Sequence, residues 1–158
     1  MGITHTSGDL LKQDVDAVVN AVNCIGVMGK GIALQFRNKW PENCRAYEAT
    51  CKANQLRPGR MFVFDSGAPS KPRFIVNFPT KGHWRSKSRI EYIRDGLTDL
   101  VAQVRRLGIR SIAVPALGCG NAGLAWAAVE PLIVAAFSQL SDVDVRLFPP
   151  NSAWPNRD

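Results

Sequence analysis

The chain has 158 residues, a length that suits one domain with a substantial core and leaves little room for a second. Hydrophobic residues make up 46% of it and charged residues 21%, which is ordinary globular usage and excludes disordered, collagen-like and coiled-coil sequences. The formal net charge of +7 raises the question of a polyanionic partner.

The sequence shows no membrane-spanning segment and no metal-binding pattern. No stretch approaches the roughly 18 to 20 apolar residues that span a bilayer, and no secretory signal pattern opens the chain. The cysteines form no C-x-x-C pair and have no histidine cluster nearby, so we expect neither a zinc site nor a disulfide framework. We also expect no cofactor. These features favour a cytoplasmic protein without a membrane partner. The four cysteines are Cys24, Cys44, Cys51 and Cys119.

The first half of the chain alternates strand patterns with helix patterns. We expect a short edge strand at 3–6 and a buried strand at 17–22, where a brief apolar run contains β-branched residues. A loop with three glycines follows at 26–31, and then a helix at 32–37. Pro41 suits the first turn of a second helix, which should end near residue 53.

The second half begins with two strand patterns, at 61–65 and 73–78, and the clearest helix of the chain follows them. Ser88 and Glu91 have the spacing of a capping box, and Gly108 is placed to end the helix. The apolar face of this helix is formed by Ile90, Ile93, Leu97, Leu100, Val101, Val104 and Leu107.

The last elements are a buried strand at 111–115, a glycine loop at 118–123, a helix through Phe137 that contains Pro131, and a strand at 143–148. Strands that alternate with helices predict an α/β fold with a largely parallel sheet covered on both faces. Ligands of such sheets bind at the carboxyl ends of the strands. Because both glycine loops directly follow strands, we expect them to meet at one edge of the sheet.

Seven basic residues gather between positions 71 and 94, a span in which Glu91 is the one acid. They form either an ordinary solvated surface or a patch that meets a polyanion, with His83 and Trp84 available for stacking. The seven are Lys71, Arg73, Lys81, Arg85, Lys87, Arg89 and Arg94.

Neither glycine loop matches a standard nucleotide motif in full. The loop at Gly26 lacks the spacing, and the hydroxyl after Lys30, that a triphosphate-binding loop needs, so we exclude nucleoside triphosphate hydrolysis. The loop at Gly118, Gly120 and Gly123 fits G-x-G-x-x-G, but it lies near the end of the chain, and one strand follows it. A nicotinamide dehydrogenase is therefore disfavoured, because its motif opens the domain.

The physical properties of the two loops still indicate an anion site. Glycines let main-chain N–H groups approach an anion closely, and a helix N-terminus adds favourable partial charge. One such loop alone would favour a tight turn without a ligand. Two at one sheet edge predict a site for the diphosphate of a nucleotide-type ligand.

With these loops the chain resembles the macrodomain family, which binds ADP-ribose. The resemblance covers nearly the whole chain and implies a three-layer α/β/α fold with a mixed, largely parallel sheet, formed by residues 1–150. Residues 151–158 would be a tail or a linker to a further C-terminal domain. The matching segments are Gly8–Leu10, Asp16–Asn23, Gly29–Ala33 and Pro115–Gly123.

The resemblance assigns the residues that contact ADP-ribose. Asp9 would accept a hydrogen bond from the adenine amino group, with the Leu10 main chain beside it, although Asp9 also fits a helix N-cap. Asn20 and Asn23 would order the first loop, with Asn23 near the distal ribose, although Asn20 also fits a buried amide. The remaining contacts would come from Gly29, Gly31, Ile32, Ala33, Thr80, Leu117, Gly118, Cys119, Gly120, Asn121, Ala122, Gly123 and Leu124.

The segments 26–36 and 77–85 resemble, more narrowly, the branch of the family that contains antitoxin macrodomains removing ADP-ribose from DNA. In that branch the lysine after Pro-Thr is catalytic, which makes Lys81 the catalytic candidate. A partly desolvated lysine has a lowered pKa and could attack the open-chain sugar as a Schiff base, releasing the modified base and leaving a covalent sugar that water frees. The alternative is a surface lysine that pairs with phosphate.

One departure from the branch concerns the second catalytic group. Many relatives carry an acid where Ala125 stands, so a carboxylate that could activate water is missing there. Cys24 and Cys119 are alternative nucleophiles, but a buried structural thiol is the more common role for such residues.

The leading hypothesis is an ADP-ribosyl glycohydrolase that acts on ADP-ribosylated single-stranded DNA, as the antitoxin to an ADP-ribosyltransferase toxin. The basic span supports DNA as the substrate, with His83, Trp84, Arg85 and Lys87 as nucleic-acid contacts. Two alternatives stay open: an ADP-ribose-binding module without activity, which the missing acid favours, and a hydrolase of ADP-ribosylated protein side chains.

Overall fold

A computed structural model describes residues 2–150, and the expected tail at 151–158 lies outside the described residues. Within them six strands form one sheet in the order β1-β6-β5-β2-β4-β3. All neighbouring pairs are parallel except β3 with β4. The mixed, largely parallel sheet is confirmed. The strands are β1 (Gly2–His5), β2 (Ala17–Val22), β3 (Phe62–Asp65), β4 (Phe74–Pro79), β5 (Ser111–Val114) and β6 (Asp144–Leu147).

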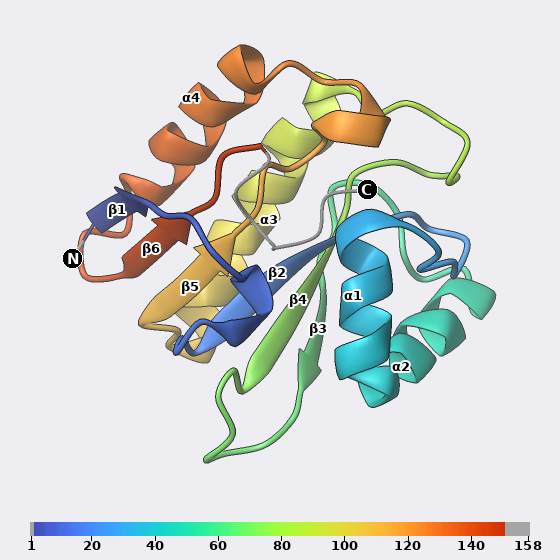
Figure 1. Cartoon of the computed structure of the whole chain (residues 1–158), viewed down its shortest axis with the longest axis horizontal. Helices are drawn as coiled ribbons and strands as arrows, with labels where there is room; N and C mark the ends of the chain where they lie inside the picture. The colour runs from blue at the N-terminus through green and yellow to red at the C-terminus, as the bar shows by residue number, and fades with distance from the viewer. Residues whose placement is uncertain (1, 151–158) are drawn as a thin grey trace.

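Helices cover both faces of the sheet, α1 and α2 on one face and α3 and α4 on the other, which confirms the predicted three layers (Figure 1). No helix within the described range has both the length and the apolar character to cross a membrane. The helices are α1 (Gly31–Lys39), α2 (Pro41–Lys52), α3 (Ile90–Leu107) and α4 (Trp126–Phe137), with short 3-10 helices η1 (Leu10–Lys12) and η2 (Gly120–Ala122).

The two central strands carry the core on both sides of the sheet. Successive side chains of a strand point to opposite faces. Val19 of β2 therefore packs in the larger core with α3 and α4, whereas Val18 packs with η1 and α1. All six residues of β4 are buried. Strands held on both faces in this way form a rigid base for the loops that leave them.

Helix α3 has the apolar face that its periodicity predicts, but it begins differently. Arg89 occupies the N-cap position and makes no side-chain capping bond, so the predicted capping box is wrong. Ser88 lies one residue too early to cap the helix. Its main-chain N–H instead donates to the oxygen of Ala122 at 2.9 Å. The helix ends at Gly108, as expected.

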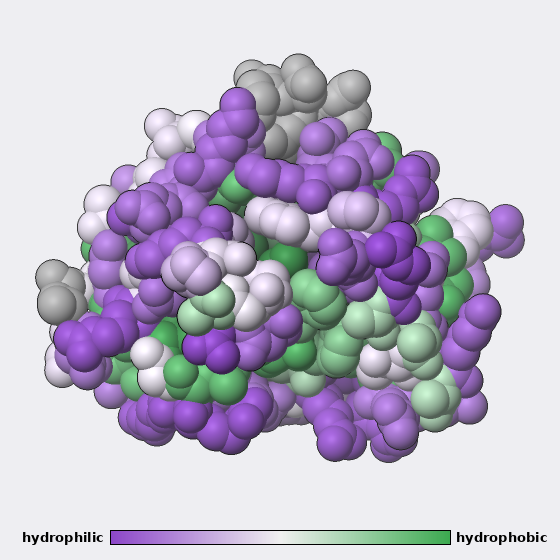
Figure 2. Space-filling view, turned by 90° about the horizontal axis from the view of Figure 1, so that it is seen from below, coloured by the Kyte–Doolittle hydropathy of each residue, from purple (hydrophilic) through white to green (hydrophobic). Residues whose placement is uncertain are grey.

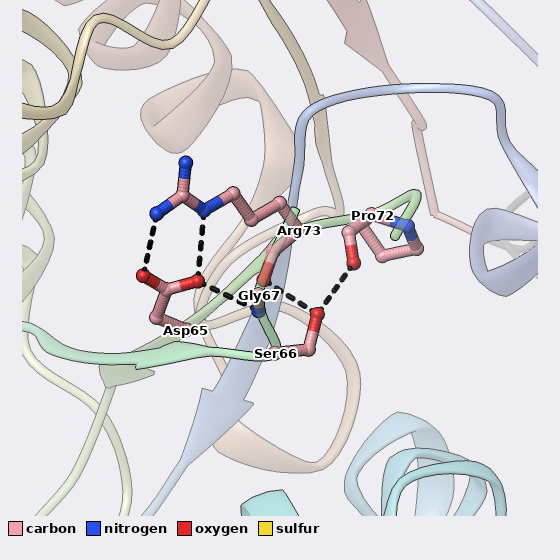
Figure 3. Close-up of polar contacts among 5 residues, drawn as sticks. All are labelled: Asp65, Ser66, Gly67, Pro72 and Arg73. Carbon is pink, nitrogen blue, oxygen red and sulfur yellow. Dashed lines mark hydrogen bonds and ion pairs between the residues drawn. The ribbon is translucent and has the colours of Figure 1, made fainter. Parts of the chain in front are cut away.

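The antiparallel hairpin of β3 and β4 is closed by an ion pair (Figure 3). Arg73 donates from Nε and Nη2 to the two carboxylate oxygens of Asp65, both at 2.9 Å. Ser66 Oγ lies 3.1 Å from the main-chain oxygen of Pro72 and 2.8 Å from that of Arg73. These contacts fix the register in which β3 adds to the edge of the sheet.

The basic span divides between the two ends of the sheet, so its seven residues do not form one patch. Lys71 and Arg73 precede β4 and are both ion-paired, Lys71 with Asp16 at 3.3 Å. Lys81 follows β4, about 20 Å further along the strand. Figure 2 views the end that carries the hairpin, where hydrophilic residues border a band of hydrophobic ones.

Candidate functional site

Three loops meet at one end of the sheet, the upper end in Figure 1, because β2, β4 and β5 are parallel neighbours. We call them the first glycine loop (residues 23–30), the lysine loop (80–89) and the second glycine loop (115–125). The prediction that the two glycine loops meet at one sheet edge is confirmed, since they follow the adjacent strands β2 and β5.

The lysine loop is hydrogen-bonded to both glycine loops. On one side the Cys24 N–H donates to the main-chain oxygen of Gly82 at 3.0 Å. On the other side the Ser88 N–H donates to the oxygen of Ala122. Residues from the middle of this loop are therefore held between the two predicted phosphate-binding segments.

The first glycine loop is ordered by the amide of Asn23. Its Nδ2 donates to the Val27 oxygen at 2.8 Å, and its Oδ1 accepts from the N–H groups of Ile25 and Val27 at 3.1 and 3.3 Å. The buried hydroxyl of Tyr47, from α2, lies 2.8 Å from the same Oδ1. Sequence reasoning missed Tyr47, because nothing distinguishes it from other core residues of its helix.

Helix α1 begins directly at the first glycine loop. Gly31, Ile32 and Ala33 form its first turn, and the N-cap residue Lys30 makes no side-chain capping bond. The first N–H groups of a helix have no partner within it. Such groups are suited to donate to an anion, which is the role that the sequence predicts for them. Gly29 is exposed beside them.

Asn20 belongs to a buried cluster of amide side chains. It pairs in register with Asn77 of β4, on the face covered by α2, and both side chains are fully buried. Its Nδ2 is 3.3 Å from Asn77 Oδ1 and 3.8 Å from Met28 Sδ in the first glycine loop. Asn43 of α2 completes the cluster by exchanging two hydrogen bonds with Asn77. Within residues 2–150, Asn20 Oδ1 has no hydrogen-bond partner.

Asp9 occupies the N-cap position of η1. Its Oδ1 accepts from the Leu11 N–H at 2.9 Å, which is the capping role that the sequence also allows. The neighbouring Leu10 is fully buried in one core cluster with Ile32 of α1 and Phe148. Phe148 directly follows β6, so η1 packs beside the same end of the sheet as the loops.

The second glycine loop is tightly packed at its first glycine. Gly118 has φ +74°, and a Cβ there would lie 2.7 Å from Leu124 Cδ1 and 3.1 Å from Ile93 Cδ1. The Leu124 N–H closes the loop by donating to the Gly118 oxygen at 2.9 Å. Leu117 is fully buried, Cys119 half-buried and Gly120 exposed, and the main chain turns through η2 to Gly123.

The two thiols near the site are not activated as nucleophiles. Burial and the neighbouring Cys51 raise the pKa of Cys24 to about 11. Burial also raises the pKa of Cys119. A reactive cysteine needs a lowered pKa, so both observations support the structural role that the sequence favours.

Lys81 lies half-buried in the lysine loop, and its Nζ donates to the main-chain oxygen of Trp84 at 3.0 Å. Burial lowers the pKa of Lys81, and the positive charges of Lys87 and Lys30 lower it further. The Lys87 stem crosses the second glycine loop, since a Cβ on Gly123 would lie 3.2 Å from Lys87 Cδ. Lys30 belongs to the first glycine loop. The lysine amine therefore has an increased neutral fraction.

The predicted nucleic-acid contacts gather at the tip of the lysine loop. The rings of His83 and Trp84 stack with centroids 5.3 Å apart, and the Arg85 guanidinium carbon lies 4.6 Å from the Trp84 ring centroid. The Arg85 N–H donates to His83 Nδ1 at 3.0 Å. All three side chains and Lys87 are exposed, whereas Thr80, at the start of the loop, is buried.

A family model described as Macro domain matches residues 19–133. The chain belongs to the Macro domain family. Among curated relatives, a DNA ADP-ribosyl glycohydrolase of Mycobacterium tuberculosis is 54% identical over 149 residues, which are 94% of this chain and 42% of that protein. One of Thermus aquaticus is 50% identical over 90% of this chain and 40% of that protein. This macrodomain therefore spans less than half the length of these relatives.

Solved structures show the same macrodomain fold. The macrodomain of Mycobacterium tuberculosis DarG has a TM-score of 0.93 and 54% identity, covering 96% of this chain and all of that one. Thermosipho africanus DarTG in complex with ADP-ribose has a TM-score of 0.86 and 30% identity, covering 99% of this chain and 43% of that one.

Proposed function

We propose that this macrodomain is an ADP-ribosyl glycohydrolase that removes ADP-ribose from modified DNA. The observation that carries the proposal is the position of Lys81, half-buried, with a lowered pKa, in a loop bonded to both glycine loops. A chain 54% identical to a DNA ADP-ribosyl glycohydrolase over 94% of its length supports the same activity.

In this proposal the diphosphate of ADP-ribose lies between the two glycine loops. The first N–H groups of α1 bind one phosphate and the backbone of Gly118–Leu124 binds the other. Asp9 keeps a second carboxylate oxygen to accept from the adenine amino group, because Oδ1 is the oxygen that caps η1. The distal ribose then lies beside Asn23 and within reach of the lysine loop.

Lys81 in its neutral form is the nucleophile. Its amine bonds to C1″ of the distal ribose while the bonds from C1″ to the ring oxygen O4″ and to the base nitrogen break, and these two atoms take the two protons that the amine loses. The resulting Schiff base is hydrolysed by one water, whose oxygen becomes the aldehyde oxygen of ADP-ribose. Lysine and intact base are both regenerated.

The proposal extends to the partner. Thermosipho africanus has a relative described as a DNA ADP-ribosyl transferase-DNA ADP-ribosyl glycohydrolase fusion protein. We infer that this macrodomain reverses the product of an ADP-ribosyltransferase toxin, as an antitoxin. Its four free cysteines support a cytoplasmic location, since reduced thiols are typical of that compartment.

The test is release of ADP-ribose from an ADP-ribosylated single-stranded oligonucleotide. Wild type and Lys71→Ala, a control at the other end of β4, should release it, and Lys81→Ala should not. Cyanoborohydride added during turnover should trap an ADP-ribose adduct at Lys81, detected by mass spectrometry. Release that persists in Lys81→Ala would exclude the lysine mechanism.

A non-catalytic ADP-ribose-binding module is the second candidate, because Ala125 stands where an acid would be. Ala125 is exposed at the start of α4 and supplies no carboxylate to activate water. If wild type releases no ADP-ribose but binds it in calorimetry, the binding module is the correct function.

A further inference from the structure

Three exposed hydrophobic side chains lie on loops of the site. Among the described residues four large ones are exposed: Ile25 at 45%, Val27 at 41%, Trp84 at 42% and Val134 at 37%. The first two lie on the first glycine loop and Trp84 lies on the lysine loop, and these two loops are bonded to each other. Val134 is on α4. Hydrophobic groups that gather at the mouth of a site indicate a binding surface.

Ile25, Val27 and Trp84 form a hydrophobic rim, and the surroundings of this rim are positively charged. Lys30 and Arg85 are exposed on the same two loops, and the half-buried Lys81 donates to the main-chain oxygen of Trp84. None of these three takes part in an ion pair within residues 2–150. The sequence has no acid between Asp16 and Glu42 or between Asp65 and Glu91, the segments that contain both loops. The rim therefore suits an anionic ligand that also presents apolar faces.

The side chains at the tip of the lysine loop have the geometry of a stacking surface. The planar groups of His83, Trp84 and Arg85 already stack on one another, and an unpaired base can extend that stack. Aromatic rings in a cationic groove are the usual way to bind single-stranded nucleic acid without reading its sequence. A protein partner would need acidic residues to match the same charges, and its surface would offer no series of flat faces for stacking.

Resting on the proposed glycohydrolase function, we propose that Ile25, Val27 and Trp84 form a platform for the unpaired bases next to the ADP-ribosylated nucleotide. Lys81 Nζ is bonded to the Trp84 oxygen, so a base on Trp84 lies beside the nucleophile. The platform makes single-stranded DNA a better substrate than an isolated ADP-ribosyl nucleotide with the same linkage.

The experiment compares kcat/KM for ADP-ribose release from an ADP-ribosylated oligonucleotide and from the ADP-ribosylated mononucleotide. Trp84→Ala keeps the main-chain oxygen that Lys81 uses, and it should lower the ratio of the two values about 5- to 100-fold. Trp84→Phe should retain most of the ratio, the Ile25→Ala/Val27→Ala pair should lower it, and the control Val134→Ala should leave it unchanged.

Other results separate the two proposals. A wild-type ratio near one, or a ratio that Trp84→Ala does not change, overturns the platform while the glycohydrolase stands. Absence of release from both substrates by wild type overturns the proposed function instead. In that case fluorescence anisotropy with unmodified oligo(dT) still tests the platform, which requires weaker binding by Trp84→Ala than by Val134→Ala.

Discussion

The hydroxyl of Tyr47 lies 2.8 Å from both oxygens of Asn23, the main-chain oxygen and Oδ1. Helix α2 thereby fixes the residue that in turn bonds to Ile25 and Val27. The loop is held in shape before any ligand arrives. Binding then does not need to order it, which preserves affinity.

Tyr47→Phe should both destabilise the fold and weaken ADP-ribose binding. The change removes the one hydroxyl donor that the two buried oxygens of Asn23 share, which costs about 1–3 kcal/mol of unfolding free energy. A looser loop should reduce ADP-ribose affinity about 2- to 10-fold. Denaturant unfolding and calorimetry measure the two effects. Tyr92→Phe on α3 is the control, and equal behaviour of the two variants would contradict the ordering role.

The pH dependence of catalysis should follow the protonation state of Lys81. Its pKa is lowered by burial and by Lys87 and Lys30, and the neutral amine reacts, so kcat/KM should rise with pH until that pKa is passed. Lys87→Gln removes a positive neighbour, stabilises the protonated lysine and should move the rise to higher pH. Lys71→Gln, at the far end of β4, should leave it in place. If kcat/KM rises over the same pH range in Lys87→Gln as in wild type, Lys81 is not the titrating group.

Alanine substitutions at Gly118 and Gly120 distinguish the free-energy cost of a strained backbone from the cost of side-chain crowding. Both have positive φ, +74° and +72°, so an alanine at either is strained by about 1–2 kcal/mol. A Cβ at Gly118 would also meet Leu124 and Ile93, whereas at Gly120 no atom lies within 4 Å. Gly118→Ala should therefore lower the unfolding free energy by about 1–2 kcal/mol more than Gly120→Ala. Thermal unfolding of the two variants checks the difference, and equal values would contradict the packing argument.

Local patterns were enough to predict the strands and α-helices of this fold and the meeting of its glycine loops, but not the 3-10 helices η1 and η2. Strand β2 occupies the predicted residues 17–22, because a short β-branched run between turn residues leaves little choice. Convergence of the loops followed from parallel strands alone. Predictions of this kind depend on residues close together in the chain.

Contacts between distant segments were beyond the reach of those patterns. Ser88 has the spacing of a cap, yet its N–H bonds to the second glycine loop, more than thirty residues away. Lys71 and Lys81 belong to one basic run, yet a buried strand separates them. The role of Tyr47 depends on how α2 is rotated against the first glycine loop. In each case the packing of whole elements, and not the local sequence, decides the outcome.

Ala125→Asp should increase both the stability of the fold and the rate at which the Lys81 adduct is hydrolysed. Ala125 is the N-cap of α4, in extended conformation and without a side-chain capping bond, so an aspartate there can accept from the first turn and add about 0.5–2 kcal/mol of stability. The same carboxylate can activate water to hydrolyse the Lys81 adduct, which should increase the single-turnover rate. Ala125→Asn caps the helix without a basic carboxylate, so it should gain stability but not rate. Thermal unfolding and rapid-quench kinetics measure both, and equal rates in the two variants would show that this position has no part in resolving the adduct.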